Sequence, residues 1–415
     1  MSAADGLRVD GDRLLSSLME MALIGATRKG GVDRQALTDG DKAARDLFTA
    51  WCESAGCSVT VDAMGNMFAR RPGRDEDLPP VAMASHLDSQ PTGGKYDGAY
   101  GVLAGLEAVR TLNDAGLQTT APLEVINWTN EEGARFAPAM ISSGVFAGVF
   151  EPEYAWARTD PDGVTLGEEL DRIGYRGDLA VGDHPLGACF ELHIEQGPIL
   201  EQAQTPVGIV TGVQGMRWYD VVMTGQESHA GPTPMEMRRD ALAGSVALLS
   251  RIYSLATDRA PAGRATIGEL HTGKGSRNTV PGSVSFTVDM RHPVEAELEA
   301  MDAGLRAAAA EVATAGRLGH SIDNIWSAAP VAFDEGCIEA VRQAASTVGC
   351  TALEVVSGAG HDAVYVSRVA PTSMIFVPCR DGISHNEAEH AEPEDLEAGA
   401  NVLLHAAMAR AGVAG

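Results

Sequence analysis

Short apolar runs alternate with helical segments along the first half of the chain, and this alternation limits the folds that are possible. Residues 81–85 (VAMAS) and 123–129 (LEVINWT) are largely apolar and have the length of buried strands. Between them, residues 101–116 have a helical pattern that stops at Gly116. Because strands that alternate with helices usually form parallel sheets, we predict an α/β fold with a mixed, largely parallel sheet flanked by helices.

The segments before and after these two predicted strands continue the alternation of strands and helices. Residues 38–56 have an apolar stripe at helical spacing, with Thr38 or Asp39 as the N-terminal cap, and residues 57–71 indicate a hairpin. The pattern resumes after about residue 328. The remaining predicted elements of this kind are strands at 189–197, 207–212, 352–357 and 372–378, and helices at 334–348 and 393–411.

The pattern changes near residue 214, where strands outnumber helices. The elements predicted there are strands at 217–225, 264–273, 282–290 and 319–326, and helices within 234–256 and 294–315. This order indicates a separate α+β domain inserted into the first one. We therefore predict a discontinuous domain formed by residues 1–212 and 329–415, with an inserted domain at 213–328. A length of 415 residues also favours two domains over one.

The charge and the cysteine content exclude several classes of protein. The formal net charge is −26, from 31 basic and 57 acidic side chains, which argues against nucleic acids and anionic membranes as partners. The six cysteines form no CxxC pair, which argues against a disulfide framework and is compatible with a reducing compartment. We see neither a signal peptide nor an apolar run of 18 residues. We therefore expect a cytoplasmic protein that does not span a membrane.

Histidine, aspartate and glutamate residues follow several of the predicted strands. A lone histidine at such a position is most often structural. Here, however, such residues recur at successive strand ends, and ligand sites of open α/β sheets gather at the carboxyl ends of strands. The residues are His86, Glu131, Glu132, His193, His361 and His385.

Imidazole and carboxylate groups without thiolates suit zinc, manganese or cobalt. Asp97, in the glycine-flanked KYDG turn, could reach between two ions. Asp88, two residues after His86, could orient the imidazole of that residue, although a plain turn residue explains it equally well. Neighbouring carboxylates on an extended segment point to opposite sides, so one of Glu131 and Glu132 could bind metal while the other acts as a general base. An acidic helix start is the alternative for this pair.

Six segments carry these residues: HLDSQPTGGKYDG, NWTNEEGARFAP, ELHIEQGPILE, SHAGPTPMEMRRDAL, SGAGHDA and GISHNEAEH. Together they resemble the hydantoinase/carbamoylase group of the M20 dinuclear-metal amidohydrolases. This group includes N-carbamoyl-L-amino-acid hydrolases, β-ureidopropionases and allantoate amidohydrolases. The resemblance extends from about residue 40 to residue 405.

The resemblance implies a role for each matching residue and a cofactor of two divalent metal ions per subunit, Zn²⁺, Mn²⁺ or Co²⁺. Glu131 matches the general base, and Asp97 matches the ligand that bridges the two ions. The implied metal ligands are His86, Asp97, Glu132, His193 and His385. The implied substrate contacts are Arg291, which would hold a carboxylate, with Asn278, Gln196 and Gly360 as nearby polar contacts.

The inserted segment resembles a lid and dimerisation domain, which implies a homodimer. His229 matches a histidine that reaches the active site of the partner subunit and stabilises the oxyanion. Arg217 and His361 are weaker candidates for substrate contacts, and Tyr100 either packs or shapes the pocket. The remaining side chains are expected to have no role in catalysis: Arg238 and Arg239 on a solvated helix face, and Glu195 and His390 as structural or exposed residues.

The implied activity is hydrolysis of the ureido C–N bond of a small anionic substrate, an N-carbamoyl-L-amino acid or N-carbamoyl-β-alanine, to an amino acid, carbon dioxide and ammonia. An allantoate amidohydrolase is the nearest alternative, because it shares every residue named above. An M20-type dipeptidase or aminopeptidase is a more distant one. A metal-stabilised binding protein without turnover is the last alternative, and Glu131 argues against it because a binding protein needs no base.

Overall fold

A computed structural model of the chain describes residues 6–413, which divide into two units. The first unit contains residues up to 212 and from 332 onward, and the second contains residues 213–331. The second junction therefore lies at 331/332, whereas the sequence analysis placed it at 328/329. Each unit is described by itself below.

The first unit is built on a nine-stranded mixed sheet with the strand order β1-β2-β4-β3-β5-β16-β6-β14, with β15 also paired to β6. Its centre, β4-β3-β5-β16, is parallel. These four strands are buried along their whole length, as expected for strands covered on both faces. The strands are β1 (Ser58–Val61), β2 (Met67–Arg71), β3 (Val81–His86), β4 (Leu123–Trp128), β5 (Ala188–Ile194), β6 (Val207–Val213), β14 (Val331–Ala332), β15 (Ala352–Ser357) and β16 (Thr372–Val377). The predicted mixed, largely parallel sheet is confirmed.

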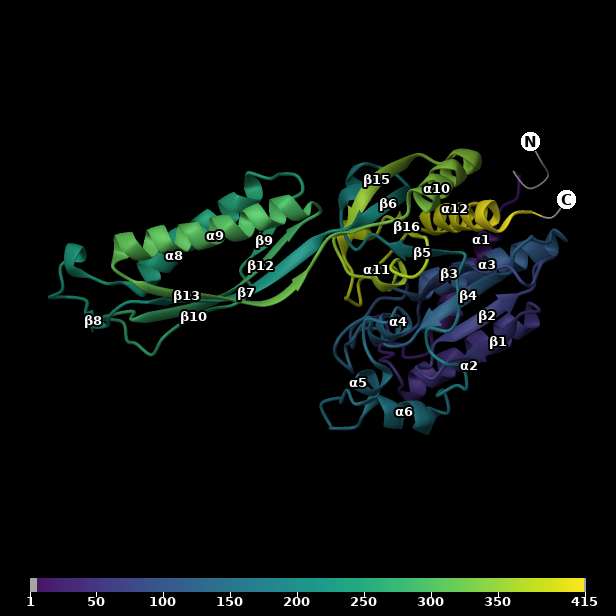
Figure 1. The fold of residues 1–415 in the computed structure, drawn as a ribbon, viewed down its shortest axis with the longest axis horizontal. Coiled ribbons are helices and arrows are strands. Elements are labelled where there is room, and N and C mark those ends of the chain that lie inside the picture. Colours follow the sequence, from purple (N-terminus) through teal and green to yellow (C-terminus); the bar gives the residue numbers. More distant parts are fainter. Residues whose placement is uncertain (1–5, 414–415) are drawn as a thin grey trace. The chain divides into compact units, whose positions relative to one another are not determined.

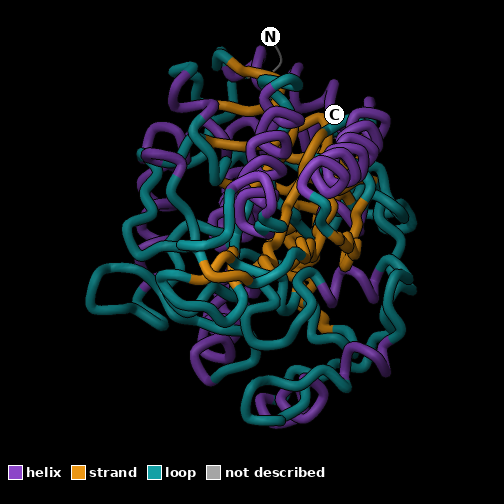
Figure 2. Tube along the Cα trace, turned by 90° about the vertical axis from the view of Figure 1, so that its left-hand side faces the viewer, coloured by secondary structure: helices purple, strands orange, loops and turns teal. Residues whose placement is uncertain are grey.

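Helices pack against this sheet (Figure 1), and Figure 2 distinguishes the helices, strands and loops of the chain by colour. The helices α3, α10 and α12 pack directly on the central strands, and α1 packs on α3 and α12. The long helices are α1 (Gly11–Ala22), α2 (Asp39–Ser54), α3 (Ala99–Asp114), α10 (Glu335–Val348) and α12 (Pro393–Ala411). Shorter ones, which the sequence analysis did not predict, are α4 (Ile141–Phe146), α5 (Pro152–Trp156), α6 (Leu166–Ile173), α7 (Ile199–Gln202), α11 (Ala363–Val366) and the 3-10 helix η2 (Arg380–Gly382).

Local sequence signals explain where several of these elements begin. The Thr38 hydroxyl accepts a hydrogen bond from the Asp41 backbone N–H and caps α2, one of the two predicted caps. The predicted hairpin at 57–71 is confirmed, because β1 and β2 pair in antiparallel fashion. The helix predicted at 101–116 begins two residues earlier, at Ala99, directly after Gly98, which has a positive φ of 65°.

The second unit contains a five-stranded antiparallel sheet with two helices on one face (Figure 1). Alternate residues of β12 point into a core shared with α8 and α9, which is the period expected of a strand with one covered face. The elements are β7 (Gly215–Thr224), α8 (Ala241–Thr257), β9 (Arg264–Thr266), β10 (Leu270–Thr272), β12 (Ser283–His292), α9 (Glu295–Gly316) and β13 (Gly319–Ala328), with a separate ribbon of β8 (Ser228–His229) and β11 (Thr279–Val280) and the 3-10 helix η1 (Met235–Met237). The predicted α+β character is confirmed.

Two predictions for this unit were wrong: the helix face for Arg238 and Arg239, and the single strand at 264–273. The helix predicted within 234–256 is present as α8, but it starts only at Ala241, where the Asp240 side chain accepts hydrogen bonds from the backbone N–H groups of Leu242 and Ala243. Arg238 and Arg239 therefore do not lie on a helix face. Arg238 donates to backbone carbonyls of the preceding loop, and Arg239 donates to the carbonyl of Arg317. The strand predicted at 264–273 is divided into β9 and β10, which both pair with β12.

Within residues 6–413, no helix is both long and apolar enough to cross a membrane.

Candidate metal centre

The predicted metal ligands come together at the carboxyl edge of the parallel strands β4-β3-β5-β16. His86 is the last residue of β3, and His193 lies near the end of β5. Glu132 follows β4, and His385 lies in the loop after β16. Asp97 directly precedes Gly98, which caps α3. The topology explains this gathering, because parallel strands present all their carboxyl ends at one edge.

Three of the residues form an inner donor group, which we define as His86, Asp97 and His193. The Asp97 Oδ1 atom lies 3.5 Å from His86 Nε2 and 3.1 Å from His193 Nε2. Both imidazoles are 1 % exposed. Each of these side chains offers one ligand atom at a mutual distance that a single cation could bridge.

An outer donor group contains Asp97, Glu132 and His385. The second oxygen of Asp97, Oδ2, lies 3.5 Å from His385 Nε2, which in turn lies 3.4 Å from Glu132 Oε2. The two oxygens of Asp97 therefore face different groups, as a bridging carboxylate requires. His385 differs from the inner histidines, because its side chain is 51 % exposed.

Hydrogen bonds of the inner imidazoles leave their Nε2 atoms as acceptors. His86 Nδ1 lies 2.9 Å from the Asp88 carbonyl oxygen, and His193 Nδ1 lies 2.9 Å from the Ile194 carbonyl oxygen. A carbonyl can only accept, so each Nδ1 carries the proton of the neutral ring. The Gly98 backbone N–H donates to His193 Nε2 at 3.2 Å, which agrees with this tautomer. Neutral imidazoles, which keep a lone pair on Nε2, are the form that binds metal.

The charges of the cluster also fit divalent cations. Among the described residues, the carboxylates of Asp88, Asp97, Glu131 and Glu132 form ion pairs only with histidines. Burial and the Asp97 carboxylate raise the pKa of Glu132 to about 8. Burial opposes ionisation of Asp97, but when His193 and His86 are protonated their positive charge and hydrogen bonds hold the pKa of this carboxyl well below its usual range. A buried set of carboxylates and imidazoles without lysine or arginine partners suits cations of +2 charge.

Glu131 lies at the rim of the inner donor group. Its Oε2 atom is 3.6 Å from His86 Nε2, and the residue is buried. Burial raises the pKa of Glu131 well above its usual value, and the neighbouring carboxylates of Asp362 and Glu132 add to this effect. A carboxylate with a raised pKa is a stronger proton acceptor than an exposed one, which is the property that a general base needs.

Asp88 has different partners from those expected. Its carboxylate is 3.9 Å from His86 Nδ1, too far for a hydrogen bond, and its backbone carbonyl orients that imidazole instead. The carboxylate accepts hydrogen bonds from the backbone N–H groups of Glu131 and Glu132, each at 3.2 Å. Asp88 therefore holds the loop that carries both predicted functional glutamates.

Gln196 and Gly360 lie in the same unit as the cluster. The Gln196 amide donates to Asp97 Oδ2 at 2.8 Å, so it supports the predicted bridging carboxylate directly. Gly360 lies in the loop before α11, where a Cβ atom would come within 3.0 Å of the Met140 side chain. The neighbouring His361 is buried and packs against the His193 ring, with ring centroids 4.6 Å apart.

The other three predicted residues belong to the second unit. His229 on β8 and Asn278, next to β11, are close together, because Thr279 is the register partner of His229 and the Ala230 backbone N–H donates to the Asn278 carbonyl. His229 Nδ1 accepts a hydrogen bond from the Gly231 backbone N–H, so the neutral ring carries its proton on Nε2. Arg291 lies on β12, and its guanidinium forms a two-point contact with Asp289.

Other residues singled out in the sequence have structural roles. Tyr100 is fully buried, and its hydroxyl donates to the Leu396 carbonyl at 2.7 Å, so it packs under α12. Glu195 accepts from two backbone N–H groups at the start of α7, and His390 pairs with Glu392, as expected for structural residues. Arg217 pairs with Glu295.

The sequence analysis overlooked Glu389. This residue is buried, and its Oε1 atom accepts from the backbone N–H groups of Tyr96 and Asp97 at 2.9 and 3.1 Å. Burial and the Asp97 carboxylate raise the pKa of Glu389 to about 7. The only signal in the sequence was its position in GISHNEAEH, four residues after His385.

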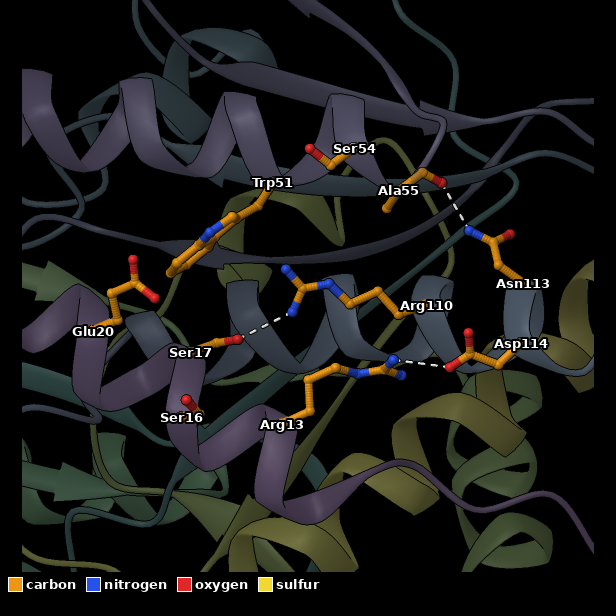
Figure 3. A pocket seen from close by; sticks show the side chains of 10 residues that line it. All are labelled: Arg13, Ser16, Ser17, Glu20, Trp51, Ser54, Ala55, Arg110, Asn113 and Asp114. Atoms are coloured by element: carbon orange, nitrogen blue, oxygen red, sulfur yellow. Dashed lines mark hydrogen bonds and ion pairs between the residues drawn. The ribbon is translucent and has the colours of Figure 1, made fainter.

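Figure 3 shows a surface pocket elsewhere in the first unit, with a volume of about 540 Å³, lined by α1, α2 and α3. Its arginines already have partners: Arg13 pairs with Glu107 and Asp114, and Arg110 donates to Ser17. None of the predicted site residues lines this pocket. It therefore does not compete with the metal centre as the candidate site.

A cluster of imidazoles and carboxylates at the carboxyl edge of such a sheet is typical of metal-dependent hydrolases. The sequence model of peptidase family M20/M25/M40 matches residues 82–409. The chain belongs to this family, and within it to the hydantoinase/carbamoylase amidases, which confirms the resemblance seen in the sequence.

Individual relatives match over almost their entire length. The chain is 51 % identical to the N-carbamoyl-L-amino-acid amidohydrolase of Rhizobium meliloti, covering 97 % of this chain and 96 % of the relative. It is 33 % identical to the allantoate amidohydrolase of Bacillus subtilis, covering 92 % and 93 %. A crystal structure of a hydantoinase/carbamoylase family amidase from Burkholderia multivorans is 59 % identical, with a TM-score of 0.95 and 98 % of each chain covered.

Proposed function

We propose that this protein is a metal-dependent N-carbamoyl-L-amino-acid amidohydrolase. The observation that carries the proposal is the pair of donor groups joined by Asp97, with the buried Glu131 carboxylate 3.6 Å from His86 Nε2. The 51 % identity to an N-carbamoyl-L-amino-acid amidohydrolase supports the choice of substrate. The reaction consumes one water and converts the ureido compound into an amino acid, carbon dioxide and ammonia.

The proposed cofactor is two divalent cations, Zn²⁺, Mn²⁺ or Co²⁺, one at each donor group. The ligands would be His86, Asp97 and His193 on one side and Asp97, Glu132 and His385 on the other. Divalent cations in such a site polarise the carbonyl group and make a water molecule more acidic.

Glu131 acts as the general base. It accepts a proton from the attacking water at a carboxylate oxygen and delivers it to the leaving nitrogen. Its raised pKa favours the first of these steps, and the second returns the carboxylate to its starting form. Asp88 takes part only through the backbone of the loop that it holds.

Residues of both units bind the substrate in this proposal. The guanidinium of Arg291 binds the substrate carboxylate, for which its planar fork is suited. His229 donates from Nε2 to the developing oxyanion in the active site of the partner subunit, since its Nδ1 is already an acceptor. Asn278, Gln196 and Gly360 supply the remaining polar contacts. We also propose that residues 213–331 form a lid and dimerisation domain, that the protein is a homodimer, and that it is cytoplasmic.

An allantoate amidohydrolase is the second candidate, because the chain also matches such an enzyme at 33 % identity. The two activities differ in the substrate and share the proposed catalytic residues. A substrate panel therefore separates them, whereas a variant of the site does not.

The test is ammonia release by protein reconstituted with Zn²⁺, Mn²⁺ or Co²⁺. The panel contains several N-carbamoyl-L-amino acids, N-carbamoyl-β-alanine and allantoate, together with dipeptides scored by free amino acid. We expect turnover of N-carbamoyl-L-amino acids that is lost on chelation and in Glu131→Gln. Turnover of allantoate alone would replace the substrate assignment, and full activity of a metal-loaded Glu131→Gln protein would overturn the mechanism.

A further inference from the structure

We propose that Glu389 is a positioning residue that sets the affinity of the centre for its metal ions by holding the turn that carries Asp97. The inference rests on the proposed function, because it takes Asp97 as a metal ligand. It goes beyond that function by assigning a role to a buried carboxylate that is itself in neither donor group.

Glu389 connects two loops that carry predicted ligands. Its Oε1 atom accepts from the consecutive backbone N–H groups of Tyr96 and Asp97. Its Oε2 atom lies 3.0 Å from the hydroxyl of Ser384, which precedes His385 and also lies 2.8 Å from Asp97 Oδ2. A single side chain thus links the Asp97 turn to the His385 loop.

The Glu389 carboxyl group packs closely against the turn that contains Gly94. A Cβ atom at Gly94 would come within 1.9 Å of the Glu389 carboxyl group, so the carboxyl fills the space that a side chain would need. Tyr96, whose backbone N–H is one of the donors, is itself buried. The carboxyl group therefore both packs against the turn and accepts its two N–H groups.

Asp88 makes a similar pair of contacts elsewhere in the centre, although with both of its carboxylate oxygens. Asp88 accepts from the consecutive backbone N–H groups of Glu131 and Glu132, as Glu389 does from those of Tyr96 and Asp97. In both cases a buried carboxylate that is not a ligand holds the main chain of a predicted ligand. Partners of this kind typically change metal affinity by about 10- to 100-fold when they are lost.

Three variants separate this role from general stability. Glu389→Ala removes the acceptor of both N–H groups. Glu389→Gln keeps it, because the amide oxygen accepts from both and the amide nitrogen can donate to the Ser384 hydroxyl. Asp62→Ala is the matched control, since Asp62 is also buried in the first unit and accepts from two backbone N–H groups, those of Met64 and Asn66, at 2.9 Å each.

The measurement is metal affinity in the absence of substrate. Full-length, metal-free proteins are titrated with Zn²⁺ in competition with a chromophoric chelator, and the absorption spectrum of the Co²⁺-loaded proteins reports the ligand geometry. We expect Glu389→Ala to bind Zn²⁺ about 10- to 100-fold more weakly, with an altered Co²⁺ spectrum. Glu389→Gln and Asp62→Ala should retain the affinity and the spectrum of the unchanged protein.

Each other outcome contradicts the inference. If Glu389→Ala binds Zn²⁺ as tightly as the unchanged protein, the positioning role is wrong and the proposed function stands. If Asp62→Ala loses as much Zn²⁺ affinity as Glu389→Ala, Glu389 contributes only to the stability of the fold and the inference is wrong. If the unchanged protein binds no metal, both proposals are overturned. Should Glu389→Ala not fold, Glu389→Asp takes its place, because its shorter side chain withdraws the carboxylate from the turn, and unchanged affinity would then overturn the inference.

Discussion

Replacing Asp88 with asparagine tests whether its carboxylate holds the loop of Glu131 and Glu132. The two carboxylate oxygens accept from the two backbone N–H groups at 3.2 Å each, and Asp88 is 2 % exposed. Asparagine keeps one acceptor and turns an NH₂ group toward the other N–H. One buried backbone donor then has no partner, which costs about 1–3 kcal/mol. For a unit of this size, the melting temperature should fall by about 2–5 °C.

The same change should slow the reaction, because the asparagine NH₂ group repels the backbone N–H that it faces and displaces the loop of Glu131 and Glu132. A displacement of about 1 Å in a catalytic group can lower the rate by about 100-fold. We therefore expect kcat for an N-carbamoyl-L-amino acid to fall by about 10- to 100-fold in Asp88→Asn. Metal must be saturating in the assay, since Glu132 moves with the loop. The contact of His86 Nδ1 with the Asp88 carbonyl does not depend on the side chain and should persist.

Asp62→Asn is the matched control, since it makes the same isosteric change at another buried aspartate of this unit. It should lower the melting temperature without changing kcat. If Asp88→Asn keeps its kcat within twofold at saturating metal, the carboxylate does not position Glu131. A large loss of kcat without any loss of stability would also contradict the reasoning, because an unpaired buried N–H must weaken the fold.

Three further predictions concern the first unit. Tyr100→Phe removes the hydrogen bond to the Leu396 carbonyl, so calorimetry should show a loss of about 1–3 kcal/mol in unfolding free energy with kcat unchanged. Arg45→Met leaves the fully buried Asp41 carboxylate without its cation, and denaturant unfolding should show a loss of about 3–5 kcal/mol. Burial and two glutamates near the start of α12 raise the pKa of Asp395 to about 6. The folded state therefore holds this proton more tightly than the unfolded state, and stability falls as the pH rises from about 4 through 6. Asp395→Asn should raise the melting temperature at neutral pH and not at pH 4; an equal effect at both would refute this.

The strand ends could be predicted from sequence because two strong patterns coincide there. Apolar runs such as 81–85 and 123–129 predict buried strands. The polar residues that follow these strands must then lie at one edge of a parallel sheet. The approach of His86 and His193 to Asp97 follows from that topology together with the motif resemblance.

What sequence could not predict depends on single hydrogen bonds. Both the backbone carbonyl and the carboxylate of Asp88 could accept a hydrogen bond from His86. The sequence does not show which of them does so, because this depends on the conformation of the folded loop. The apolar pattern of 234–256 does not reveal that Asp240 starts the helix. Glu389 is one acidic residue among 57 acidic side chains, and its partners come from a turn nearly 300 residues earlier in the chain.

The unequal exposure of the two donor groups has a kinetic consequence. His86 and His193 of the inner donor group are 1 % exposed, whereas the side chain of His385 in the outer group is 51 % exposed. An ion held by the inner donor group would leave only when the surrounding loops open, whereas an ion held beside His385 would border the solvent. Two ions bound as proposed should therefore have different residence times. A preparation that has lost the more labile ion would regain activity on adding metal, so that the free metal concentration of the surroundings would regulate turnover.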